Sequence, residues 1–167
     1  MAKTLTKSPH ADLYETDYYR WLEEQAELLR EGRLEDIDAL NLISEFEELA
    51  VGERASVQSH AEPIVEHLLK LQHSPADRPR RGWRLTVTRH RGRLSKQLTT
   101  TLHHLLKTSL EEVFKDARRV AVIGLEVDRV PAGQLPNECP YTLEQILDPG
   151  WLPENVHGII DLVPEGS

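Results

Sequence analysis

The 167-residue sequence contains a single cysteine, Cys139, so the chain forms no internal disulfide bond. One thiol also excludes zinc and iron–sulfur centres that are built from several cysteines. The lack of disulfides fits a reducing compartment, and the first residues include no apolar stretch of the length found in secretory signal peptides. We therefore expect a cytoplasmic protein.

The sequence also lacks the motifs on which most cofactor and nucleophile chemistry depends. Its nine glycines form no phosphate-binding loop of the Walker or dinucleotide type, and no Gly-x-Ser-x-Gly turn occurs. Among the histidines on predicted helices, only His73 has a histidine or an acid three or four positions away, which is the spacing of helical metal sites, and its partner Asp77 lies in a proline-containing loop. No run of about 18 apolar residues occurs, so no membrane span is predicted. We expect no cofactor and no local metal site, and leave open only a metal held between different helices.

Charge is sorted along the chain, although the formal net charge is −8. Residues 15–66 contain 15 acidic and 4 basic side chains, whereas residues 78–96 contain seven arginines, one lysine and no acid. The negative total argues against a protein whose whole surface binds nucleic acid. The arginine run is the segment best suited to a polyanionic partner.

Apolar residues recur at helical spacing over most of the chain, between capping residues and helix breakers. The predicted helices cover residues 17–32, 38–52, 59–73, 83–98 and 99–124. Whether the second and third are separate stays open, because Ser59 and Glu62 form a capping box but Pro63 falls one position too late for it. The predicted buried face of the first helix is Tyr18, Leu22, Ala26 and Leu29, with Trp21 and Leu28 beside it. That of the second is Leu42, Ile43, Phe46, Leu49 and Ala50.

Beyond Asp128 the sequence becomes rich in proline and glycine. Thr142 and Gln145 form a capping box for one short helix, and later apolar residues such as Trp151 indicate that part of this segment lies across the other helices. We predict an all-α fold: an up-and-down bundle of four or five helices over residues 13–128, with an irregular Pro-rich C-terminal segment, residues 129–167, in the same domain. Residues 1–12 are predicted to form a flexible tail.

Five short patches occur in a fixed order. They are Tyr14-Glu-Thr-Asp17-Tyr-Tyr-x-Trp21-Leu, Leu40-Asn-Leu-Ile43-Ser-Glu45, His67-Leu-Leu-Lys70, Trp83-Arg-Leu-Thr-Val-x-x-x-Arg91 and Pro136-x-Glu-Cys-Pro-Tyr-Thr-Leu-Glu-Gln-Ile-Leu147. This set resembles the bacterial domain of unknown function family 29 over nearly all of residues 14–151. The resemblance implies a small helical protein and no particular function. It places Glu45, His67, Lys70, Trp83 and Arg91 at signature positions. The chain departs from the family at Leu71-Gln-His73, where members carry an aromatic after the lysine, so no stacking role is assigned there.

The spacing of apolar residues in the fourth helix leaves one core position for either His90 or Arg91. An arginine there would be largely desolvated, and an unpaired buried guanidinium is very costly, so we expect a carboxylate to meet Arg91. Glu45 or Glu47, beside the apolar face of the second helix, is placed to do so. Such an ion pair serves architecture more often than catalysis.

The functional interpretation is an open polar cleft in which Glu45, His67 and Arg91 converge, with His67 as general base. Lys70 is a further candidate catalytic residue on the same stripe as His67. The structural interpretation gives His67 a carbonyl or carboxylate partner at the edge of the core. It pairs Lys70 with Glu66 one helical turn earlier.

The arginine run from Arg78 to Arg93 also supports two interpretations. It neutralises the acidic helices within the fold, or it binds an acidic or nucleic-acid partner through Arg80, Arg81, Trp83 and Arg84. We expect a cytoplasmic interaction or regulatory module with a protein partner or a second copy of itself, nucleic acid being a less favoured partner. The alternative is a hydrolase or nuclease-like enzyme that uses the Glu45, His67 and Arg91 cleft.

Overall fold

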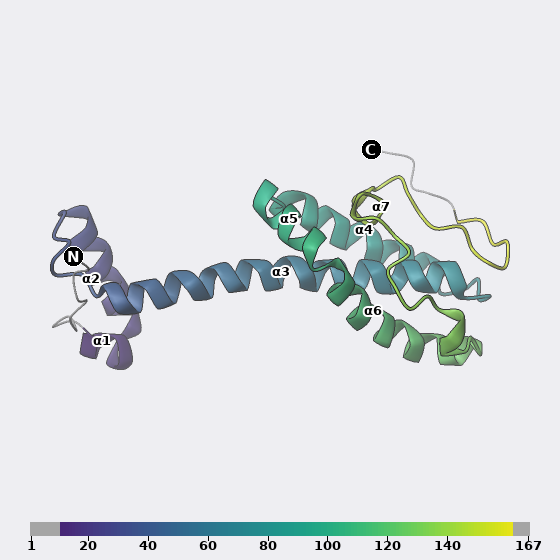
Figure 1. The fold of residues 1–167 in the computed structure, drawn as a ribbon, viewed down its shortest axis with the longest axis horizontal. Helices are drawn as coiled ribbons and strands as arrows, with labels where there is room; N and C mark the ends of the chain where they lie inside the picture. The colour runs from purple at the N-terminus through teal and green to yellow at the C-terminus, as the bar shows by residue number, and fades with distance from the viewer. Residues whose placement is uncertain (1–10, 162–167) are drawn as a thin grey trace. The chain divides into compact units, whose positions relative to one another are not determined.

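The computed structural model describes residues 11–161, and over this range it contains helices and irregular segments but no β-strand. The α-helices are α1 (Ala11–Thr16), α2 (Tyr18–Arg30), α3 (Ala39–His73), α4 (Arg80–Gln97), α5 (Thr100–Thr108), α6 (Leu110–Leu125) and α7 (Leu143–Leu147) (Figure 1). Two short 3-10 turns, Glu126–Asp128 and Ala132–Gln134, lie between α6 and α7. The predicted all-α class is confirmed.

The predicted tail, residues 1–12, lies mostly outside the described residues, but its last two residues begin α1. Residues 162–167 of the predicted C-terminal segment lie outside the described range as well. The chain divides into two compact units with the boundary between Gly52 and Glu53, which falls inside α3.

The first unit has a polar group at its centre. Trp21 of α2 is fully buried, and its indole N–H donates to Asp38 Oδ2 at 3.3 Å. The Asp38 backbone N–H donates to Gln25 Oε1 at 2.7 Å, and Asn41 Nδ2 donates to Asp38 Oδ2 at 2.8 Å. Because Asp38 is itself only 3% exposed, these contacts join α2 to the start of α3 through hydrogen bonds as well as apolar packing.

The bounds of α2 agree with the prediction, whereas its buried face does not. Asp17 accepts a hydrogen bond from the backbone N–H of Arg20, and Gly32 takes a positive φ of 71° just beyond the helix, as expected of an N-cap and a C-terminal glycine. The helix buries Trp21, Gln25 and Leu28, while the predicted core residues Tyr18, Leu22 and Leu29 are exposed.

The predicted second and third helices are one helix, α3, of 35 residues. Pro63 lies inside it, where the missing N–H removes one backbone hydrogen bond. Ser59 does not cap a new helix there, because its hydroxyl donates back to the carbonyl of Ser56 at 2.8 Å. Of the predicted apolar face in the first part of α3, only Leu42 is buried.

The second unit has a continuous apolar core drawn from the later part of α3, from α4 to α7 and from residues 130–141. Its fully buried side chains include Ile64, Leu68, Leu94, Phe114 and Ile146. Trp151 and Leu152 pack against this core, so the irregular segment does cover the helices, as predicted.

Hydroxyl side chains set the helix ends between α4 and α6. The Thr99 hydroxyl accepts from the backbone N–H of Leu102 and caps α5, as predicted. The sequence predicted one helix from there to Gly124, but the chain interrupts it at Ser109. The Ser109 and Thr108 hydroxyls both donate to the carbonyl of Leu105, at 3.0 and 2.9 Å, which favours a break over continued helix.

We expect Asp38→Ala to lower the free energy of unfolding by about 1–3 kcal/mol, because it leaves the buried indole N–H of Trp21 without its acceptor. Urea denaturation followed by circular dichroism measures this loss. Glu35→Ala, which removes an exposed acid from the same unit, should change stability far less. Equal effects of the two substitutions would contradict a structural role for Asp38.

Candidate functional site

His67 lies on α3 at the edge of the core of the second unit. Its Nδ1 lies 2.8 Å from the carbonyl oxygen of Pro63, and a carbonyl can only accept, so Nδ1 carries the proton and Nε2 is left as an acceptor. Desolvation lowers the pKa of His67, against the opposing effects of this carbonyl and of Glu66. The imidazole is therefore neutral at pH 7.

Lys70, one turn after His67, is held by its neighbours. Its ammonium donates to Glu66 Oε1 at 2.5 Å, which is the predicted pair, and the two side chains are 12% and 16% exposed. A Cβ added at Gly124 of α6 would lie 2.5 Å from Lys70 Cε and Nζ. The lysine thus lies against a glycine of α6, and a larger residue there would displace its ammonium.

Arg91 fills the predicted core position in α4 and is only 6% exposed. Its guanidinium donates to three backbone carbonyls of the C-terminal segment, those of Ile146 at 2.8 Å, Trp151 at 2.9 Å and Gln145 at 3.0 Å. Two of these carbonyls belong to α7, a helix whose last carbonyls have no partner within it. Burial lowers the pKa of Arg91 to about 10, so the group stays charged at neutral pH.

Glu45 has partners of its own in the first unit. Its carboxylate accepts from the hydroxyl of Tyr14 at 2.7 Å and from that of Tyr18 at 2.6 Å. These bonds lower the pKa of Glu45, that from Tyr18 having the larger effect, and the same carboxylate raises the pKa of Tyr14 to about 12. Arg91 thus meets three carbonyl oxygens where a carboxylate was expected, and the charge of Asp148 opposes the lowering of its pKa. The expected pairing of Arg91 with Glu45 or Glu47, which belong to the other unit, stays a prediction.

Arg80, a predicted partner-binding residue, is instead part of the fold. It is 2% exposed, forms an ion pair with Asp161, and donates to the carbonyls of Leu71 at 2.7 Å and Ser74 at 3.3 Å. The Asn155 amide donates to the same two carbonyls at 2.7 and 2.9 Å. Together they satisfy the end of α3, so Arg80 is not available to a partner.

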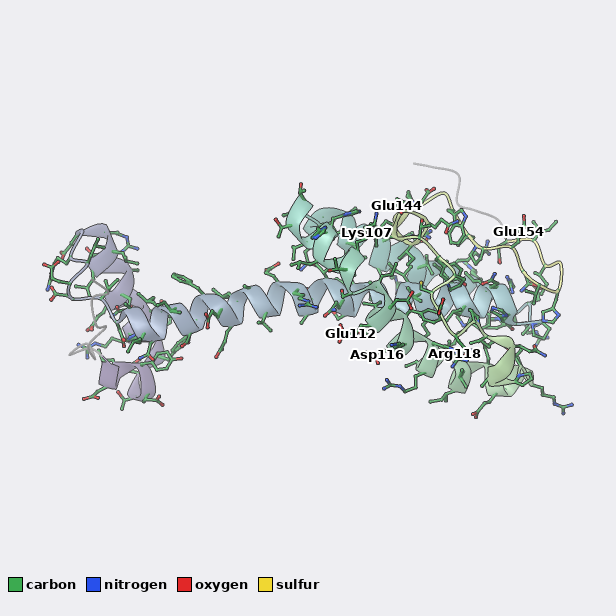
Figure 2. All side chains as sticks on the ribbon, viewed as in Figure 1. Lys107, Glu112, Asp116, Arg118, Glu144 and Glu154 are labelled. Atoms are coloured by element: carbon green, nitrogen blue, oxygen red, sulfur yellow. The ribbon has the colours of Figure 1, made fainter. Side chains whose placement is uncertain are left out.

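Arg118 on α6 repeats this arrangement. Its guanidinium donates to the carbonyls of Pro136 at 2.7 Å and Ala132 at 3.0 Å in the irregular segment after α6 (Figure 2). Lys107 of α5 and Glu144 of α7, also labelled there, form an ion pair at 3.3 Å. Sequence analysis missed Asn155, Asp161 and Arg118, because a contact with a distant backbone carbonyl leaves no pattern in the side chains.

The other predicted partner-binding residues differ in exposure. Arg81 is exposed, Trp83 and Arg84 are half-buried, and Arg84 Nε lies 3.8 Å from Asp161 Oδ1. Further along the same side of α4, Arg89, Arg93 and Lys96 are exposed as well.

Exposed cations recur every three to eight residues along this side of the helix. We call Arg81, Arg89, Arg93 and Lys96 the basic face of α4. No ion pair within residues 11–161 engages these four side chains. From Arg81 to Lys96 the face extends about 22 Å by helix rise. A Cβ added at Gly82 or Gly92 would meet no atom within 4 Å, so the described chain leaves the surface around them uncovered.

Comparison with protein families supports the resemblance of the five patches. The family model described as Domain of unknown function DUF29 matches residues 13–152. The chain belongs to this family. Searches of curated proteins and of solved structures found no match. Membership of the DUF29 family assigns no activity to the side chains above.

Two further classes of site were sought in the described part of this DUF29 chain. No group of three or more His, Cys, Asp or Glu side chains between residues 11 and 161 is arranged to hold a metal ion. No helix in that range is long and apolar enough to cross a membrane. Its most distinctive polar features are the buried arginine contacts and the basic face of α4.

Arg91→Lys should lower the free energy of unfolding by about 2 kcal/mol or more, because an ammonium cannot reach three carbonyls in the geometry of the guanidinium fork. Hydrogen exchange should become faster in residues 143–152. Arg119→Lys, at an exposed position of α6, serves as the matched control and should leave both measurements nearly unchanged. Unchanged exchange in residues 143–152 would refute the role given to Arg91.

Stability should also fall in mild acid. Burial lowers the pKa of His67, His73 and His90, so the unfolded chain binds protons that the folded chain does not. This stabilisation is fully present above the ordinary histidine pKa of 6.5 and is lost as the pH falls below it. Urea denaturation at about pH 7.5 and about pH 5.5 measures the difference, which His67→Gln should reduce and the exposed control His104→Gln should not.

Proposed function

We propose that this protein is a cytoplasmic helical interaction module that binds the phosphates of a nucleic acid through the basic face of α4. The observation that carries the proposal is the exposure of Arg81, Arg89, Arg93 and Lys96 on one side of a helix that contains no acid. Arginine donates two parallel hydrogen bonds to a phosphate, and an array of cations gains affinity by releasing counterions from the polyanion.

The overall charge of −8 does not oppose this proposal, because it does not belong to the unit that carries α4. Residues 53–167 contain 15 acidic and 15 basic side chains, whereas residues 11–52 contain 13 acidic and 3 basic. The described ion pairs of α4 are with Asp161, by way of Arg80 and Arg84. Neutralisation inside the fold therefore accounts for those two arginines and not for the basic face.

The enzyme alternative has less support from the geometry. The guanidinium N–H groups of Arg91 donate to carbonyls of the C-terminal segment, and no hydrogen bond between described residues joins Arg91 to His67. Glu45 is held by two tyrosine hydroxyls. Of the three residues, only His67, whose Nε2 is left as an acceptor, has the form of a general base, and it alone gives the enzyme alternative its remaining support.

The test measures binding of the full chain to a short labelled DNA duplex and a short labelled RNA strand by fluorescence anisotropy. The triple variant Arg81→Gln, Arg89→Gln, Arg93→Gln should bind at least about tenfold more weakly at low salt. Its affinity should also depend less on salt between about 50 and 200 mM, because fewer counterions are released. Arg119→Gln is the matched control, since Arg119 is exposed on α6 and is paired with Asp116.

Equal affinity of the triple variant and the unaltered protein would refute the basic face as the binding surface. Binding to polyglutamate but to neither nucleic acid would contradict a nucleic-acid partner and indicate an acidic protein surface. Loss of binding in Arg119→Gln as well would show a general effect of charge and no localised face.

A further inference from the structure

The first unit carries a row of large apolar side chains that the described chain leaves uncovered. Leu40, Ile43 and Phe46 follow one another at intervals of three along α3 and are 47%, 47% and 61% exposed. Side chains spaced by three form a continuous ridge on a helix surface, and such a ridge packs into the groove of a second helix. We call these three residues the apolar ridge of α3.

The ridge is not the side of α3 that packs against α1 and α2. Those contacts come from Asp38, Asn41, Leu42 and Glu45, which are spaced three and four residues apart and so share another side of the helix. Within its own unit α3 therefore has one covered side and one apolar side that is left exposed.

The later part of α3 shows how packing against neighbouring helices lowers the exposure of apolar side chains. In the second unit the apolar residues Val57, Ala61, Ile64 and Leu68, at spacings of four, three and four, share one side of the helix and are at most 1% exposed. The ridge residues are of the same kind and differ in having no helix over them. Contiguous exposed apolar side chains of this size mark interaction surfaces in soluble proteins.

Charge identifies the kind of partner. The unit around the ridge, residues 1–52, holds 13 acidic and 5 basic side chains, and Glu47 and Glu48 are exposed beside the ridge. The three arginines of residues 11–52 are already paired with acids of the same unit, Arg20 with Glu24, Arg30 with Glu27, and Arg33 with Asp36 and Glu31. The field around the ridge is therefore strongly negative and attracts a cationic partner.

We propose that the apolar ridge of α3 docks an amphipathic helix of another protein, with aliphatic residues on its contact side and lysine or arginine on its flanks. Its aliphatic stripe covers the ridge, and its basic flanks meet Glu47 and Glu48. A second copy of this chain fits less well, because a symmetric contact would bring two units with a large excess of acid together. This surface is independent of the basic face of α4, so either proposal can fail alone.

The experiment uses the full chain and two synthetic helices of three heptads, about 21 residues, with leucine at the core positions. One carries lysine and the other glutamate at the flanking positions. Isothermal titration should show micromolar binding of the lysine peptide and none of the glutamate peptide. Hydrogen exchange should show slower exchange in residues 39–51 when the lysine peptide is bound.

Ile43→Ser with Phe46→Ser should weaken binding of the lysine peptide at least tenfold, with helix content by circular dichroism unchanged. Val127→Ser with Ile160→Ser removes two exposed apolar side chains from the second unit and is the matched control, which should bind like the unaltered protein. The proposal is overturned if the lysine peptide does not bind, or if the ridge variant binds it equally well. It is also overturned if light scattering shows a dimer of the unaltered protein that the ridge variant abolishes.

Discussion

Contacts between arginine side chains and backbone carbonyls are the interaction on which the second unit depends. A carbonyl at a helix end or in an irregular segment has no partner in a regular ladder, and burying it unpaired is costly. Arg80, Arg91 and Arg118 supply those partners at the end of α3, at α7 and after α6. The guanidinium suits this role because it presents five donors in a fixed plane. The Pro-rich segment, which forms few hydrogen bonds of its own, is thereby held against the helices.

The division of charge has a separate consequence for the surface. The excess of acid belongs to residues 11–52, while the unit beginning at Glu53 is balanced and carries a basic helix face. A polyanion at the basic face of α4 and a basic helix at the apolar ridge of α3, as proposed above, are in keeping with this division of charge.

Prediction from sequence succeeded where the determinants lie within one helical turn. The caps at Asp17, Thr99 and Thr142 each depend on a side chain and an N–H three residues away. The cap at Thr142 and helix starts at residues 17 and 99 were predicted. The pairing of Lys70 with Glu66 was predicted for the same reason. The partners of Arg91 were not, because they are carbonyls 54 to 60 residues away that any sequence would supply.

The sequence by itself determined that the chain is helical, that helices begin near residues 17, 99 and 142, and that either His90 or Arg91 faces the core, since these follow from periodicity and short-range hydrogen bonding. Tertiary structure alone decided which apolar positions are covered. Leu42 and Phe46 look equivalent in the sequence, yet one is 9% and the other 61% exposed. The reason is that burial depends on which elements pack against a helix, and amphipathic spacing does not specify them.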